Sequence, residues 1–303
     1  MASLDRASDL DSLVTEASRA GADYASRSTR ELVELMNEGD AAVPAAVGSV
    51  LGALSDAIDA VVARLEAAGR LVYVGAGSSG RIGALDADEC EATFSTGPGQ
   101  VVALVAGAGL DSATDREAAE DDAEAGRRDV ERLGVASQDA VVGISASGRT
   151  PYTLGALEAA AAAGALTVAL VAVPASELAR IAAHELAVVV GPEFLAGSTR
   201  LKAGTAQKLV LNTISTVAMI RLGKTYGDLM VDVRASNEKL AARARRIVRV
   251  STGASDEEAE QALASAGGSA KVAVVSLLAN VDAAAARERL EQAKGHVRSA
   301  LER

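Results

Sequence analysis

Between residues 70 and 191, short runs rich in β-branched residues alternate with stretches of helical character. The five runs are RLVYVG, QVVALVAG, DAVVGIS, ALTVALVAV and ELAVVVG, at 70–75, 100–107, 139–145, 165–173 and 185–191. Strands that alternate with helices form a parallel sheet with helices on both faces. The pattern therefore predicts a doubly wound α/β fold, in which ligands bind at the carboxyl ends of the strands.

The sequence on either side of this region predicts helices. Residues 26–40 and 42–68 have helical periodicity, with Pro44 near the start of the second helix. We expect a long helix at about 202–222, and the chain after Val233 is typical of a small helical bundle used in packing or dimer contacts. The predicted organisation is an N-terminal helical extension at 1–50, a doubly wound domain at 51–233 and a C-terminal helical subdomain at 234–303.

Composition and charge exclude several kinds of partner. The net charge is −11 and aromatic residues are only 2%, which disfavours binding to nucleic acid or to an anionic membrane. Cys90 has no second cysteine to pair with, and the sequence shows neither a secretory signal nor a membrane-spanning apolar run. His184 and His296 stand in unrelated contexts, so no metal site and no Ser-His-acid triad is predicted. We expect a cytoplasmic protein.

Two loops rich in glycine and hydroxyl groups follow predicted strands. GAGSSGR at 75–81 opens a helix, and its glycines with Ser78 and Ser79 suit a phosphate, although a simple strand-to-helix turn has the same pattern. It is not a Walker loop, and the acidic residue of a dinucleotide site is missing. SASGRTPY at 145–152 repeats the pattern, which favours a shared phosphate site. Its candidate ligands are Ser145, Ser147, Arg149 and Thr150.

A third loop, GPEFLAGSTRLKAGTAQKLVLN at 191–212, supplies more polar groups near a predicted helix start. Its candidate substrate contacts are Glu193, Ser198, Thr199 and Lys208. Other roles stay open, because Ser198 and Thr199 also suit helix capping and Lys208 suits a solvated helix face. An arginine just inside a helix, such as Arg149, is also compatible with a structural ion pair.

Two helical stretches, ALDADECEATF at 84–94 and REAAEDDAEAG at 116–126, carry many carboxylates. Most are expected to face solvent. Glu89, however, lies among apolar residues on the helix that follows the first loop, which predicts partial desolvation and a raised pKa. Spacing alone does not choose Glu89 over Glu91, or Glu120 over Glu117.

Several of these stretches, among them GAGSSGRIGALDADECEATF, EAAEDD, GISASGRTPY, GPEFLAGSTRLKAGTAQKLVLN and LMVDV, together resemble one known family. It is the N-acetylmuramic acid 6-phosphate etherase family of the sugar isomerase (SIS) superfamily, and the resemblance covers nearly the whole chain. It implies a SIS domain, a homodimer, no cofactor, and cleavage of the lactyl ether of a sugar phosphate. The family's two catalytic glutamates fall on Glu89 and Glu120. Glu91 and Ala92 stand where the family usually has two prolines.

The resemblance implies a mechanism by elimination and addition. We assign Glu89 as the general acid that protonates the departing lactate oxygen and Glu120 as the base at C2. Two other classes of function are a SIS aldose–ketose isomerase and a non-catalytic sugar-phosphate sensor. A sensor needs neither glutamate, so the presence of both favours an enzyme.

Overall fold

The computed structural model describes residues 13–18, 23–232 and 238–302. The chain forms two compact units, Met1–Ala87 with Val101–Ile214, and Asp88–Gln100 with Ser215–Arg303. The domain boundary predicted at 233/234 lies outside the described residues, and the predicted division into three parts stays a prediction.

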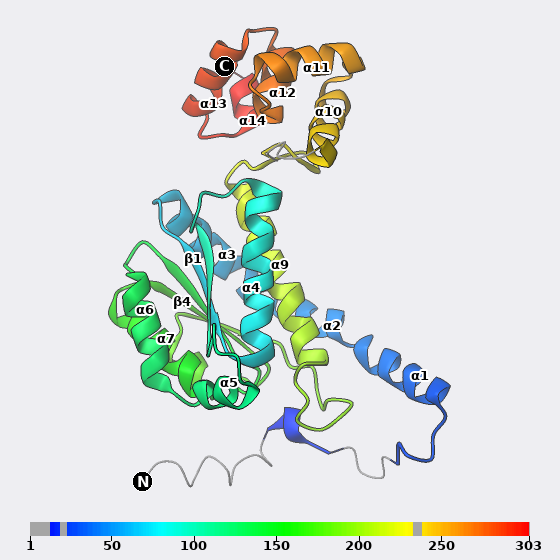
Figure 1. Cartoon of the computed structure of the whole chain (residues 1–303), viewed down its shortest axis with the longest axis vertical. Coiled ribbons are helices and arrows are strands. Elements are labelled where there is room, and N and C mark those ends of the chain that lie inside the picture. Colours follow the sequence, from blue (N-terminus) through cyan, green and yellow to red (C-terminus); the bar gives the residue numbers. More distant parts are fainter. Residues whose placement is uncertain (1–12, 19–22, 233–237, 303) are drawn as a thin grey trace. The chain divides into compact units, whose positions relative to one another are not determined.

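The first unit is built on a five-stranded parallel sheet (Figure 1). Its strands are β1 (Leu71–Gly75), β2 (Val101–Val105), β3 (Ala140–Ile144), β4 (Leu166–Val171) and β5 (His184–Ala187). The order β2-β1-β3-β4-β5 means that the chain crosses from one side of β1 to the other between β2 and β3. All five predicted strands are confirmed. β5 ends before residue 191 because its neighbour β4 ends at Val171, the partner of Ala187.

Helices cover both faces of this sheet, which confirms the doubly wound fold. On one face, α6 (Ala123–Leu133), α7 (Pro151–Ala162) and α8 (Glu177–Ile181) bury alternate residues of the strands such as Val72 and Val74. The other face is covered by α3 (Leu51–Glu66) and α4 (Gly77–Phe94), and the long helix α9 (Lys202–Arg221) appears as predicted. Gly83 of α4 lies directly against Tyr73 of β1.

The predicted N-terminal helices are present, with one correction. α1 (Thr29–Asp40) begins at a capping box formed by Ser28 and Glu31. The single helix predicted at 42–68 is wrong, because the chain forms α2 (Val43–Gly48) and α3 with a break between them. At the break, the Ser49 hydroxyl donates to the Ala46 carbonyl, a local bond that competes with continuing the helix.

The acidic stretch at 116–126 is also two helices instead of the one that was predicted. α5 (Ala113–Glu120) ends at Glu120, and α6 starts after Asp122. The Asp122 carboxylate accepts a hydrogen bond of 2.8 Å from the backbone N–H of Ala125 and so caps α6. Glu120 therefore lies at a helix end, where the chain changes direction.

The second unit contains the predicted C-terminal helical bundle. Its helices are α10 (Glu238–Thr252), α11 (Asp256–Ser265), α12 (Ala270–Ala279), α13 (Ala283–Gln292) and α14 (Val297–Leu301). A small hairpin of β6 (Thr225–Tyr226) and β7 (Leu229–Met230), which the sequence did not predict, precedes them. Asp232 after the hairpin pairs with Lys271 of α12 at 2.8 Å and with Lys224 at 3.0 Å.

In the described part of the chain, no single helix is both long and apolar enough to cross a membrane. Two bent pairs of helices, Thr29–Gly48 with Leu51–Glu66 and Asp256–Ser265 with Ala270–Ala279, meet the length and composition only when each pair is taken together.

Candidate functional site

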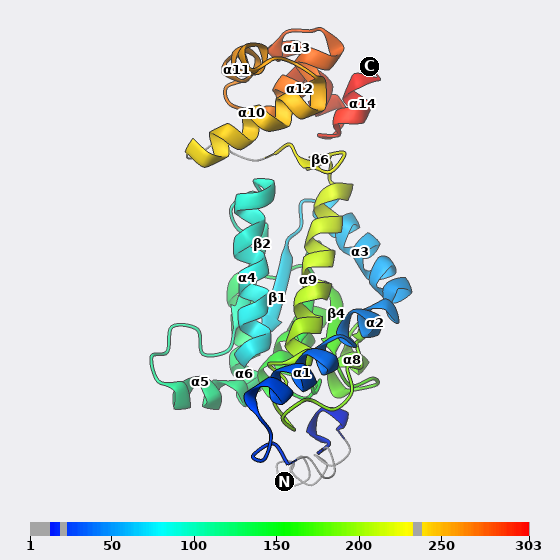
Figure 2. The ribbon, with the colours of Figure 1, turned by 90° about the vertical axis from the view of Figure 1, so that its right-hand side faces the viewer.

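The two hydroxyl-rich loops begin side by side at the carboxyl edge of the sheet. Gly75, the last residue of β1, pairs with Ile144, the last residue of β3. These two strands flank the point where the strand order reverses, and ligands of open α/β sheets bind in the crevice at such a point. Figure 2 shows α5, which ends at Glu120, at the same end of the sheet, toward which β1 points.

The first loop is a tight turn that requires its glycines. A Cβ atom on Gly80 would lie 2.5 Å from the carbonyl oxygen of Gly75, so the chain can fold back on itself only without a side chain there. Ser78 and Ser79 are half-buried at the start of α4. The Ser78 hydroxyl accepts a hydrogen bond of 3.1 Å from the guanidinium of Arg81. The loop thus presents two hydroxyls and a cation next to a helix N-terminus, a suitable setting for a phosphate.

The second loop is organised around the buried hydroxyl of Ser145. It lies 2.8 Å from Thr150 Oγ1 and 3.5 Å from Ser147 Oγ, and it accepts from the backbone N–H of Gly148 at 3.0 Å. The backbone N–H of Arg149 donates to Ser147 Oγ at 3.3 Å. The structure therefore brings the hydroxyls of Ser145, Ser147 and Thr150 together before α7 begins, and Arg149 contacts Ser147 through its backbone N–H.

The structure shows that Glu193 has contacts within the third loop itself. Its side chain is 1% exposed, and both carboxylate oxygens accept backbone hydrogen bonds at the start of α9, from Lys202 at 3.0 Å and Ala203 at 2.9 Å. Glu193 thus caps the start of α9, and capping by Ser198 or Thr199 stays a prediction. The Glu193 carboxylate thus binds backbone groups of the protein itself. Ser198 and Thr199 are half-buried in the turn before the helix.

Gln207 connects the first and third loops. This side chain is buried, and its Oε1 accepts a hydrogen bond of 3.1 Å from the Ser79 hydroxyl. Lys208, the neighbouring residue on α9, is exposed, as expected of a solvated helix face. Gln207 belongs to the third stretch but was not among the predicted ligands. Only tertiary structure identifies it, because α4 and α9 are far apart in sequence.

Glu120 lies against the first loop and is only partly exposed. A Cβ atom on Gly77 would lie 2.7 Å from Glu120 Oε1, so the carboxylate occupies space that only a glycine leaves open. Burial raises the pKa of Glu120; the charge of Arg81 acts in the opposite direction, and Asp121 and Glu117 add to the rise. A carboxyl of this kind, beside a phosphate-type loop, is suited to proton transfer.

Glu89 lies in the second half of α4 and is exposed in the single chain. The partial desolvation predicted for it is therefore wrong for the chain on its own. The buried side of the helix contains Gly83, Ala87, Cys90 and Phe94 instead. Whether Glu89 acts together with Glu120 stays a prediction.

Asp86 is a buried carboxylate that the sequence analysis did not single out. It is 4% exposed, accepts a hydrogen bond of 2.7 Å from the Tyr73 hydroxyl and also accepts from the amide of Asn212. A signal was present, because Asp86 falls on the same helical stripe as Gly83 and Cys90. The contacts join β1, α4 and α9 beneath the loops.

A separate hollow lies in the second unit. A cavity of about 340 Å³ is lined by residues of α10 and α11 and by Gly268. None of its lining residues was predicted as a site residue, and the chemistry described above belongs to the loops of the sheet.

Comparisons with known proteins agree with the fold. The chain matches the model of the glucokinase regulatory protein N-terminal SIS domain over residues 53–161 and the model of the SIS domain over residues 124–216. A solved phosphoheptose isomerase from Francisella tularensis superimposes with a TM-score of 0.50 at 18% identity, covering 64% of this chain and 100% of that one.

Similarity to curated sequences extends over almost the whole chain. A protein of Rubrobacter xylanophilus named N-acetylmuramic acid 6-phosphate etherase is 59% identical, with 96% of this chain and 97% of that protein covered. A protein of the same name from Streptomyces coelicolor is 54% identical, with 98% of this chain and 96% of that protein covered. At this coverage, the matched region spans the positions of all three loops and of Glu89 and Glu120.

Proposed function

The chain belongs to the N-acetylmuramic acid 6-phosphate etherase family, and from this premise we propose how its loops and glutamates carry out the reaction. The substrate is the sugar phosphate N-acetylmuramic acid 6-phosphate. The enzyme is a carbon–oxygen lyase that releases D-lactate and leaves N-acetylglucosamine 6-phosphate. Sequence identity of 54–59% over almost the full chain supports this activity.

The first and second loops hold the phosphate, with the third loop beside them. The candidate ligands are Ser78, Ser79, Ser145, Ser147, Arg149, Thr150, Ser198, Thr199 and Lys208. Binding this remote group positions the sugar for a reaction elsewhere on the ring.

The position of Glu120 against Gly77 is the observation that carries the mechanism. In the open-chain sugar, the hydrogen on C2 lies next to an aldehyde and is acidic. Glu120 removes this proton, and the electron pair forms the C2–C3 double bond as the C3–O bond breaks. Because burial raises its pKa, the ionised Glu120 is a stronger base than an ordinary carboxylate.

Glu89 completes the reaction. Its acid form protonates the departing lactate oxygen, and the resulting carboxylate then helps to deliver water to C3 while the proton returns to C2. Glu89 is exposed in the single chain. Leu85 lies one turn earlier on the same face of α4 and is 57% exposed.

We infer that a second copy of the chain covers this face, which fits a homodimer and would desolvate Glu89. A sugar phosphate is an intracellular metabolite, so we also place the enzyme in the cytoplasm.

The test measures D-lactate release from N-acetylmuramic acid 6-phosphate by the wild type, Glu89→Gln and Glu120→Gln. The controls are Glu91→Gln and Asp115→Asn, which change exposed carboxylates on the same two helices. We expect each site variant to lose about 10²-fold or more in kcat and each control to keep wild-type activity. Active Glu89→Gln or Glu120→Gln would contradict the assignment. Folded wild type that binds the sugar phosphate without releasing lactate would favour an isomerase or a sensor.

A further inference from the structure

The first turns of α6 and α7 touch backbone to backbone. A Cβ atom on Gly126 of α6 would lie 2.0 Å from the carbonyl oxygen of Tyr152, and one on Gly155 of α7 would lie 2.0 Å from that of Ala123. No side chain fits at either place. The two glycines therefore let the helix that follows Glu120 and the helix that follows the second loop approach at their starting points.

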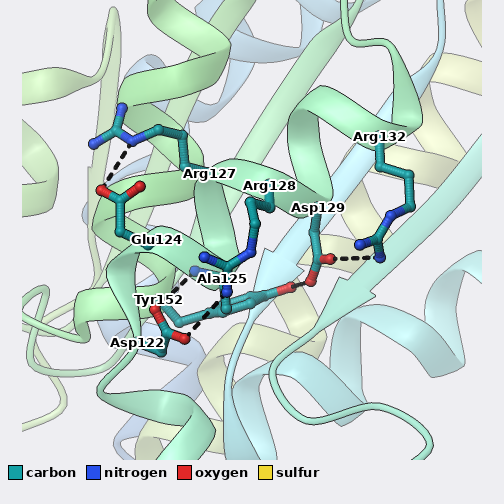
Figure 3. Close-up of polar contacts among 8 residues, drawn as sticks. All are labelled: Asp122, Glu124, Ala125, Arg127, Arg128, Asp129, Arg132 and Tyr152. Atoms are coloured by element: carbon teal, nitrogen blue, oxygen red, sulfur yellow. Dashed lines mark hydrogen bonds and ion pairs between the residues drawn. The ribbon is translucent and has the colours of Figure 1, made fainter.

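A partly buried hydrogen bond joins the same two helices (Figure 3). The Tyr152 side chain is 1% exposed, and its hydroxyl donates to Asp129 Oδ2 at 2.8 Å. Arg132 also contacts this carboxylate, at 3.3 Å from Oδ1. Burial and the bond to Asp129 raise the pKa of Tyr152 well above its ordinary value, so the phenol stays a donor at every pH used in an assay.

Tyr152 and Asp129, the two residues that this bond joins, are each connected along the chain to a part of the proposed site. Tyr152 stands two residues after Thr150, whose hydroxyl bonds to Ser145 in the second loop. Asp129 belongs to α6, whose first residue, Ala123, stands three residues after Glu120. The cap at Asp122 makes the short connection between Glu120 and α6 well defined.

We propose that Tyr152 is a positioning residue, whose hydrogen bond to Asp129 fixes α6, and with it Glu120, relative to the second loop. The inference rests on the proposed role of Glu120 as the base. Two glycine contacts bring the helices close, but they do not prevent one helix from sliding along the other. A directional bond from the buried Tyr152 hydroxyl to the partly buried Asp129 carboxylate sets their register.

A second link between the helices provides a matched control. Arg127 of α6 pairs with Glu158 of α7 at 2.9 Å, but the two side chains are 33% and 50% exposed. Exposed ion pairs of this kind contribute little because water screens them. If any link between α6 and α7 were sufficient, loss of either one would change kcat to a similar extent. If Tyr152 positions Glu120, only loss of the Tyr152–Asp129 bond should lower kcat.

The experiment compares Tyr152→Phe with Glu158→Gln in the full chain. For Tyr152→Phe we expect kcat to fall about 10- to 100-fold, as for a misplaced catalytic group, with KM changed less than about threefold. Glu158→Gln should match the wild type. Asp129→Ala should behave like Tyr152→Phe, and Asp129→Asn, which keeps an acceptor oxygen, should recover most of the activity.

A second measurement separates positioning from general loss of stability. The carboxyl carbon of Glu120 is followed by NMR as a function of pH, with Arg81, Asp121 and Glu117 as the charged neighbours that act on it. In Tyr152→Phe, water should reach a displaced Glu120, so its pKa should fall toward the ordinary value and the acidic limb of the kcat profile should move to lower pH. A variant that is less stable but still positions Glu120 correctly would keep the wild-type titration of the Glu120 carboxyl.

The outcomes distinguish this inference from the proposed function. Wild-type kcat and an unchanged Glu120 titration in Tyr152→Phe would overturn the positioning role. Full activity of Glu120→Gln would overturn the catalytic role of Glu120, while a shifted titration in Tyr152→Phe would still show that Tyr152 sets the surroundings of this carboxyl. If Tyr152→Phe does not fold, Asp129→Ala and Asp129→Asn decide the question.

Discussion

Replacing Gly77 by alanine tests where Glu120 acts. Gly77 has φ = +53°, and a Cβ atom there would lie 2.7 Å from Glu120 Oε1, compared with 3.4 Å or more in ordinary contacts. The positive φ costs an alanine about 1 kcal/mol. The clash is with the far end of a flexible side chain, so the carboxylate moves instead of the backbone, by about 0.7 Å. A shift of about 1 Å in a reacting group lowers the rate by up to about 10²-fold.

The assay is D-lactate release, with Gly134→Ala as the control. Gly134 also has a positive φ of +65°, but a Cβ atom there meets nothing within 4 Å. Both variants should lose about 1 kcal/mol of stability, measured by urea unfolding. Only Gly77→Ala should also lose activity, about 10- to 100-fold in kcat with little change in KM.

Two results would refute the reasoning. Normal kcat in folded Gly77→Ala would mean that Glu120 does not react from the position seen beside the first loop. Equal loss of kcat in the two variants would mean that backbone strain, not displacement of Glu120, is responsible.

Two further predictions concern buried carboxylates. Glu193→Gln should lose about 1.5–3 kcal/mol of local stability, because a charged acceptor of two backbone bonds becomes neutral; faster hydrogen exchange at Lys202 and Ala203 measures this. A raised KM with unchanged exchange would instead favour the predicted substrate contact of Glu193. At Asp139, burial acts to raise the pKa, but hydrogen bonds from Arg70 and from backbone N–H groups together hold it below its ordinary value. Its stabilising effect is therefore present above the unfolded-state pKa and is lost as pH falls through the lower folded-state pKa. Asp139→Asn should be less stable than the wild type at pH 7, and urea unfolding should show the difference shrinking toward pH 3; a constant difference would contradict this.

Alternation of strands and helices predicts the sheet well because buried parallel strands need continuous apolar runs. The same local reasoning fails at the helix breaks. Ser49 and Asp122 end or start helices through single side-chain bonds to nearby backbone groups. Such residues occur in helices as well as at their ends, so periodicity alone extended the helices through both positions.

Candidate site residues can be predicted from the sequence where one loop contains all of them. The hydroxyls of Ser145, Ser147 and Thr150 are close in sequence and close in space. Contacts between distant segments are not predictable in this way. The bond of Ser79 to Gln207, the cap that Glu193 forms on α9 and the exposure of Glu89 all depend on how helices pack, which the sequence pattern does not specify.

The parts of the proposed site differ in how far a single chain already positions them and shields them from solvent. In the second loop, the hydroxyls already bond to one another and to the backbone, so a phosphate meets groups that need little rearrangement. Glu120 is likewise placed and partly desolvated within a single chain. Glu89 is not, because solvent reaches it. The proposed binding groups and the proposed base are therefore positioned within a single chain, whereas the proposed acid, Glu89, is open to solvent there. If the proposed second subunit covers Glu89, we expect assembly to affect departure of lactate more than removal of the C2 proton.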